Sequence, residues 1–330
     1  MKYRILSACA LACALALGVS AQEKKPAEVK VSGGEREAAQ KIEKAKGTEA
    51  RLQAAAAFVK KYPQSSLRAQ VAQGIAEEIR QTADHQQKAS LAQVFLDIFT
   101  LPEEVQLVNA SLLNAYINTG RTEEALKMGN DWLAKHPDDI QTMQNLTILA
   151  ASEAIKGNNA FVAQGRQHGA KAISLLESDK VPEGVDTAKW PELKQSTLLS
   201  LYRETGVLAF KAGDKEAALP LLEKAVALNS PDPGVHLIVS DLHNEEYELR
   251  AKEYSVAAPA ERPAAMKRAE EQLDKVIDSY ARAIALTDGN AQYQQANAFL
   301  RQGLESYYKF RHKKTEGMQQ LIDKYKRPAQ

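Results

Sequence analysis

Two stretches of this chain, residues 107–139 and 200–232, each have the pattern of one helix–turn–helix hairpin of about 34 residues. In each stretch apolar residues recur at spacings of three and four, which places them on one helix face, and Gly120 or Gly213 stands at the turn. A hairpin of this kind cannot bury its apolar face alone and has to stack on further hairpins. The pattern therefore predicts an elongated repeat protein.

The rest of the chain continues the helical pattern. From Glu35 onward Ala, Leu, Gln, Glu and Lys dominate, and no segment alternates apolar and polar residues long enough to predict a strand. We therefore expect an all-α, right-handed superhelical solenoid of about six or seven antiparallel helix hairpins. Outside the two clear hairpins, the helices are expected in pairs at residues 36–45 with 49–62, 67–82 with 86–99, 140–155 with 161–176, 235–254 with 263–286, and 291–311 with 316–325.

The first 21 residues have the composition of a secretory signal peptide. Lys2 and Arg4 precede an apolar run over residues 5–17, and small residues follow as far as Ala21. The run is shorter than the roughly 20 apolar residues that span a bilayer, and no later run reaches that length. A lipoprotein-like sequence ends at Cys9, but it has too few apolar residues before it. We therefore expect cleavage near Ala21, a flexible leader over residues 22–34, and a periplasmic or secreted protein.

Composition excludes several kinds of site. The two cysteines, Cys9 and Cys13, both lie in the predicted signal peptide, so the mature protein has no disulfide, thiolate nucleophile or cysteine–zinc site. Removal of Lys2 and Arg4 leaves 41 basic residues of the original 43 against 42 acidic ones. Because a nucleic-acid-binding domain is typically basic, this balance argues against a nucleic-acid partner.

Residues 179–191 interrupt the helical rhythm. Pro182, Gly184 and Pro191 predict an inserted loop there, with helical repeats over residues 35–178 before it and 192–330 after it. Just before the loop, Gly165 and Gly169 fall within a predicted helix. Since glycine costs about 1 kcal/mol per residue in a helix, this pair indicates the close approach of a neighbouring helix.

The two clear hairpins resemble the repeats of tetratricopeptide-repeat (TPR) proteins. That pattern combines large and small residues on the first helix with a small residue on the second and a closing proline. The matching residues are Leu112, Tyr116, Ala125 and Pro137 in one hairpin and Tyr202, Gly206 and Ala218 in the other. The departures are Asn109 and Gly129, which replace large residues, and Ser230, which replaces proline. The resemblance implies a non-catalytic scaffold that holds a protein or extended peptide.

The same resemblance implies where the partner binds, because TPR ligands lie in a groove lined by the first helix of each hairpin. The residues expected to face that groove are Asn114 and Asn118 in one hairpin and Arg203, Val207, Phe210 and Lys211 in the other. We expect residues 200–211 and 235–254 to contribute most, since arginine and tyrosine dominate binding hot spots. The basic C-terminal residues mainly cap the last repeat, with weak association with the envelope as a lesser role.

No residue pattern indicates catalysis. His-Glu-x-x-His and Gly-x-Ser-x-Gly are absent, and the six histidines are scattered. His236 and His243 share a helix face, and we interpret them as half-exposed polar residues rather than metal ligands. The sequence therefore predicts no enzyme, no cofactor and no metal. The alternative is a helical-toroid enzyme that acts on glycan or peptide through catalytic carboxylates that no motif reveals.

Overall fold

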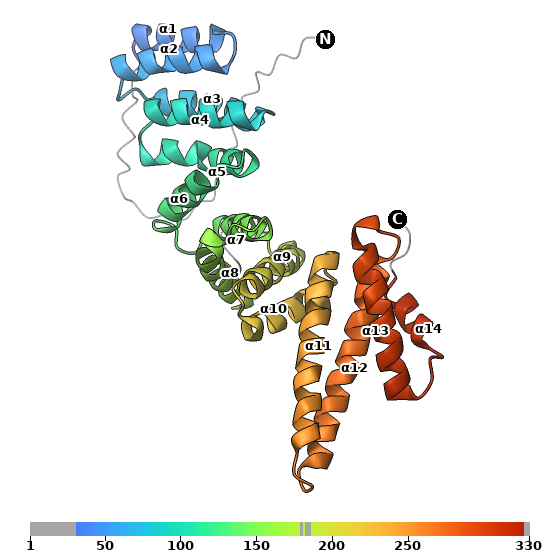
Figure 1. Ribbon diagram of the computed structural model, residues 1–330. Helices are drawn as coiled ribbons and strands as arrows, with labels where there is room; N and C mark the ends of the chain where they lie inside the picture. Colours follow the sequence, from blue (N-terminus) through green and yellow to red (C-terminus); the bar gives the residue numbers. More distant parts are fainter. Residues whose placement is uncertain (1–30, 179–180, 182–185, 327–330) are drawn as a thin grey trace, which may run out of the picture. The chain divides into compact units, whose positions relative to one another are not determined.

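The computed structural model describes residues 31–178, 181 and 186–326, and every regular element in this part of the chain is a helix (Figure 1). The predicted all-α fold, an array of antiparallel helix hairpins, is confirmed. Two short 3-10 helices, η1 (Asn159–Phe161) and η2 (Ala291–Tyr293), interrupt the series. The α-helices are α1 (Gly33–Lys44), α2 (Thr48–Lys61), α3 (Arg68–Gln81), α4 (His85–Ile98), α5 (Pro102–Asn118), α6 (Thr122–Leu133), α7 (Ile140–Ile155), α8 (Val162–Glu177), α9 (Trp190–Lys211), α10 (Lys215–Ala227), α11 (Pro233–Val256), α12 (Arg262–Thr287), α13 (Gln294–His312) and α14 (Met318–Lys324).

Capping side chains explain where several helices begin. At α1 the Ser32 N–H donates to Glu35 Oε2 at 2.7 Å, and the Glu35 N–H donates to Ser32 Oγ at 3.2 Å. The carboxylates of Asp139, Asp214 and Asp232 accept backbone N–H groups at the starts of α7, α10 and α11. Each cap satisfies donors that the first helical turn leaves without a partner.

Glycines serve both the turns and the helix contacts. Gly213, between α9 and α10, has φ of +76°, a conformation that other residues rarely adopt. In α8, a β-carbon at Gly165 would overlap that of Ala150, and one at Gly169 would overlap Thr205 Oγ1. The close helix approach predicted from these two glycines is confirmed.

The chain divides into two compact units. The first comprises residues 31–83 with 90–109, and a buried ion pair links α3 to α5 within it. Arg68 Nε donates to Glu104 Oε1 at 2.6 Å, and Arg68 Nη2 donates to Glu104 Oε2 at 2.9 Å. Because a buried charge is costly unless it is paired, this bidentate contact fixes the two helices together. The fully buried apolar side chains of the unit include Leu52, Phe58, Ile79, Phe95, Phe99 and Val108.

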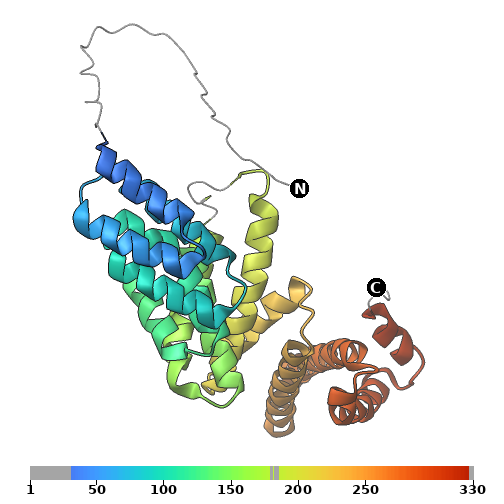
Figure 2. The same ribbon diagram turned by 90° about the horizontal axis from the view of Figure 1, so that it is seen from above.

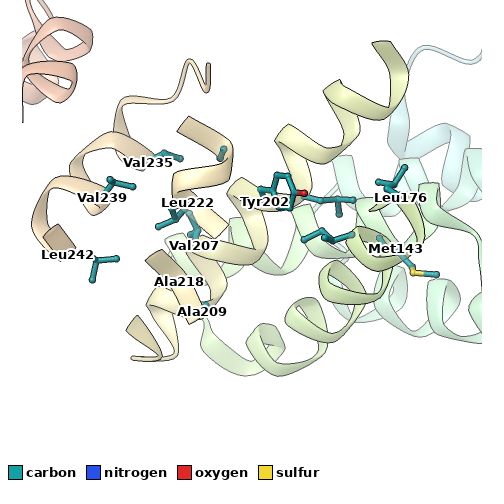
Figure 3. Packing of buried hydrophobic residues seen from close by; sticks show 14 of the residues in the cluster. Met143, Leu176, Tyr202, Val207, Ala209, Ala218, Leu222, Val235, Val239 and Leu242 are labelled. Atoms are coloured by element: carbon teal, nitrogen blue, oxygen red, sulfur yellow. The ribbon is translucent and has the colours of Figure 1, made fainter. Parts of the chain in front are cut away.

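The second unit comprises residues 84–89 with 110–326, and one apolar cluster runs through its helices α7 to α11 (Figure 3). Farther along the chain, α11 and α12 form the longest hairpin and run side by side in both views (Figures 1 and 2). A second cluster, around Leu273, Tyr280 and Leu304, joins α12 to α13 and α14. The unit is thus a series of hairpins in which each helix packs on its neighbours.

Two helix starts differ from the sequence prediction. Helix α1 begins at Gly33, inside the predicted leader, because Ser32 and Glu35 cap it there. Helix α9 begins at Trp190, so Pro191 lies in its first turn, where the fixed φ of proline suits a helix. The signal peptide and residues 179–180 and 182–185 of the inserted loop lie outside the described residues, and the predicted domain ranges stay predictions. Among the described helices, none is both long and apolar enough to cross a membrane.

Candidate functional site

Helices α1 and α3, with Arg51 of α2, line a groove of about 450 Å³ in the first unit. The two helices are the first members of successive hairpins. Ile42 and Ile75 line the groove and are buried. The other apolar residues that line it are Ala39, Leu67 and Val71. The groove therefore offers an apolar floor between the two helices.

Gly74 opens the middle of this groove. It lies in the interior of α3, where glycine costs about 1 kcal/mol relative to alanine. A β-carbon built on Gly74 would have no neighbouring atom within 4 Å, so no close helix contact requires the glycine. What the missing side chain provides is open space along the floor.

The charged residues of the groove differ in whether their side chains have a hydrogen-bond or ion-pair partner within the protein. Arg51 forms an ion pair with Glu78, and its Nε donates to the carbonyl oxygen of Ala45 at 3.1 Å. Thr48 Oγ1 donates to Glu78 Oε2 at 3.1 Å. Arg36 is exposed, and among the described residues no hydrogen bond or ion pair engages its guanidinium. Arg36 is therefore the cation available to a carboxylate that enters the groove.

The structure places two of the predicted site residues of α9 against the core. Val207 is 6% exposed and packs in the same cluster as Tyr202 and Leu222 (Figure 3). Phe210 is half-buried and packs against that cluster. Val207 is thus buried in the core that helices α7 to α11 share. Lys211 is exposed.

Arg203 forms an ion pair with Glu204 of the same helix. Its Nε donates to Glu204 Oε1 at 2.8 Å, and the Glu204 side chain is nearly buried. Burial raises the pKa of Glu204, while the neighbouring Arg203 guanidinium opposes that rise. The half-exposed arginine therefore first serves to compensate a buried carboxylate.

Asn114 and Asn118 are both exposed on α5. Asn118 Nδ2 donates to the carbonyl oxygen of Asn114 at 2.8 Å and to its Oδ1 at 3.2 Å. Their hydrogen bonds stay within one helix, and the two side chains form no joint site with the α9 residues through these bonds. As a binding site, the six predicted residues stay a prediction.

A second hollow, of about 420 Å³, lies among α10, α11 and α12. Glu223, Asp274 and Asp278 line it, but Asp274 is paired with Arg311 at 2.8 Å and Asp278 with Arg282 at 2.8 Å. These pairings occupy two of its three carboxylates with structural partners.

His236 and His243 are buried, at 5% exposure each, and not half-exposed as the sequence suggested. Their faces of α11 pack inward, where His236 Nε2 lies 3.0 Å from the Ser230 carbonyl oxygen. The ring of His243 lies 3.2 Å from Gln272 Nε2, and burial lowers its pKa. In the described part of the chain no cluster of three metal-ligating side chains occurs.

Sequence reasoning missed the α1–α3 groove, since its residues are the Ala, Gln and Leu that also suit packing. Gly74 was the available signal, because a glycine in a helix interior needs a reason.

Comparison with known proteins adds little to this geometry. No family model and no curated protein matches the chain. A crystal structure of a tetratricopeptide repeat protein from Parabacteroides merdae ATCC 43184 is similar, with 12% sequence identity and a TM-score of 0.37. The match covers 81% of this chain and 96% of that one. The fold assignment rests on the helices described above.

Proposed function

We propose that this chain is an exported, non-catalytic scaffold of the cell envelope that binds a segment of another protein in the α1–α3 groove. The apolar floor of the groove carries the proposal. Apolar side chains beside open space bind apolar side chains of a partner, because the contact removes both from water. Arg36 at the same surface favours a segment that carries a carboxylate next to its apolar residues.

The proposed binding site lies on α1 and α3. The TPR resemblance instead implied a site that includes residues of α9. In the α1–α3 groove the first helices of two hairpins leave an open volume between them. On α9 the corresponding apolar side chains already pack within the protein. A scaffold of either kind needs no convergent catalytic groups.

Site-specific photo-crosslinking in whole cells tests the location. A photoreactive residue at Gln70, which lines the groove, should crosslink a partner. The matched control is the same residue at Gln53, an exposed glutamine of α2 that does not line it. A second variant, Gly74→Phe, should fill the groove and reduce the Gln70 adduct at least about tenfold.

Because the β-carbon position of Gly74 is open, Gly74→Phe should keep the wild-type helical signal in circular dichroism. Equal crosslinking from Gln70 and Gln53, or an adduct unaffected by Gly74→Phe in a folded protein, would contradict binding in this groove.

The enzyme alternative would use the hollow among α10, α11 and α12, where carboxylates face one volume. It predicts that Glu223→Gln abolishes hydrolysis of envelope glycan or peptide while the protein stays folded. The scaffold proposal expects no such hydrolysis from the wild-type protein, and a clear activity lost in Glu223→Gln would overturn it.

A further inference from the structure

Helix α13 carries two strongly exposed phenylalanines. Phe299 is 68% exposed and Phe310 is 62% exposed, whereas Phe58, Phe95 and Phe99 are at most 1% exposed. Because removing a phenylalanine ring from water is favourable, two exposed rings on one helix indicate a surface with a binding partner.

Both rings lie on one face of α13. They are eleven residues apart, which is three helical turns and about 20° more, so they stand roughly 16 Å apart along the helix axis. Ser306 lies between them on the same face and is exposed. Leu300 and Leu304 point to another side of the helix, where they are buried in the cluster with α12. The two rings therefore project beyond the packed side of α13.

Three exposed lysines lie beside Phe310 in the sequence. Lys309 precedes it, and Lys313 and Lys314 follow the end of α13. Lys313 Nζ lies 4.9 Å from the centre of the Phe310 ring and donates to the Phe310 carbonyl oxygen at 2.9 Å. Among the described residues no ion pair engages any of the three lysines. Their ammonium groups are therefore available to anions near Phe310.

The neighbouring carboxylates belong to other sides of the helix. Glu305 is the one acidic residue of α13 and lies about 120° around the helix from Phe299. Glu316 follows the helix, and its carbonyl oxygen accepts a hydrogen bond from the hydroxyl of Tyr308, which is on the side of α13 opposite Phe299. The face that carries the two rings is thus positively charged.

We propose that this face binds the surface of a lipid bilayer that contains anionic lipids. We call it the Phe–Lys face and define it by Phe299, Lys309, Phe310, Lys313 and Lys314. The rings enter the boundary between headgroups and acyl chains, and the lysines contact the lipid phosphates. This binding does not depend on the α1–α3 groove.

The spacing of the rings favours a bilayer over a protein partner. The core of a protein interface is predominantly apolar, whereas the polar side chains of Gln302 and Ser306 separate the two rings. A bilayer admits each ring separately, and two rings on one line along a helix reach the same plane together. The helix dipole accounts for a lysine near the end of α13, but it does not account for the exposed rings.

Sedimentation with lipid vesicles tests the proposal. The protein is produced without residues 1–21, since their apolar run would itself bind lipid. It should bind vesicles of phosphatidylcholine with about 30% phosphatidylglycerol at least about tenfold more strongly than vesicles of phosphatidylcholine alone, because the lysines need an anionic surface. Binding to the anionic vesicles should weaken as NaCl is added, since salt screens exposed charges.

Two sets of substitutions test the two parts of the face. Phe299→Ser/Phe310→Ser removes the rings, and Lys309→Gln/Lys313→Gln/Lys314→Gln removes the charges. Each should weaken binding to the anionic vesicles at least about tenfold.

Each set has a matched control that should bind as the wild type does. For the rings it is Leu249→Ser/Val256→Ser on α11, which removes side chains that are 58% and 77% exposed. For the charges it is a set of three exposed lysines in the first unit, changed as Lys44→Gln/Lys46→Gln/Lys60→Gln. Circular dichroism checks that every variant stays folded.

Three results would overturn the proposal. The first is a wild-type protein that does not bind anionic vesicles, even if α13 captures an acidic protein. The second is a folded ring variant that binds as the wild type does, because binding then rests on charge alone. The third is an equal loss of binding in the matched controls, because other exposed side chains then serve as well as the Phe–Lys face.

Discussion

The α1–α3 groove and helix α9 differ in whether their apolar residues are open to a partner. We compare them because both regions belong to the same kind of helix hairpin. Both involve first helices of hairpins, and both carry apolar residues. In the groove, Ala39 and Val71 line an open volume. On α9, Val207 and Phe210 pack against the protein's own core. An apolar residue on a repeat face can thus serve either the partner or the neighbouring helix, and only the packing decides which.

The largest expected effect comes from Phe210→Ala. If Phe210 is a core residue, the substitution should lower the free energy of unfolding by about 2 kcal/mol, since it removes a half-buried ring from the cluster. Urea denaturation measures the change, and Lys211→Ala, at the exposed neighbour, should change little. Crosslinking from Gln70 should persist in the folded fraction. Unchanged stability with lost crosslinking would instead make α9 the binding surface.

Much of the fold could be predicted because helix periodicity and turn residues are local signals. Helix α7 has the bounds that the periodicity gives, and Gly213 turns the chain where the pattern places the turn. Gly165 and Gly169 in α8 also predicted a close helix contact, although the sequence does not identify the neighbouring helix. These features depend on neighbours within a few residues in the sequence.

The site could not be predicted in the same way, because exposure depends on residues far along the chain. Val207 is buried by helices whose position the α9 sequence does not contain. Likewise, His236 and His243 are buried beside Ser230 and Gln272, which lie outside α11. Leu249 follows the buried Leu242 by seven residues on α11, yet it is 58% exposed, and the spacing alone does not reveal this difference.

A second expected effect is on how protein stability depends on pH, which differs between a buried and an exposed carboxylate. Burial raises the pKa of Glu204 in the folded protein above its ordinary value of 4.5. The stabilising contribution is therefore fully present below the ordinary pKa and is lost as pH rises through the folded pKa. Relative to Glu204→Gln, the wild-type protein should lose stability as pH rises above the ordinary pKa of a glutamate. Thermal denaturation across this range measures the difference.

Glu37→Gln is the control of opposite sign. A hydrogen bond from Lys41 lowers the pKa of the exposed Glu37, so its stabilisation is present above the ordinary pKa and is lost as pH falls. The wild-type protein should therefore gain stability over Glu37→Gln as pH rises. A Glu204→Gln profile parallel to the wild-type profile would show that Glu204 is solvated, and α9 would then be more open than described.

The smallest expected effect tests the groove itself through two glycines of helix interiors. Gly74→Ala should raise the free energy of unfolding by about 0.5–1 kcal/mol, because alanine favours the helix and its β-carbon meets only open space. Gly206→Ala should lower it, since a β-carbon there would lie 2.7 Å from Leu222 Cδ2. Urea denaturation compares the pair. If Gly74→Ala destabilises the protein as Gly206→Ala does, then side chains fill the space above α3, and the α1–α3 surface is packed as α9 is. The two substitutions should change the free energy of unfolding in opposite directions, because the helix face at Gly74 is open and the face at Gly206 is packed against Leu222.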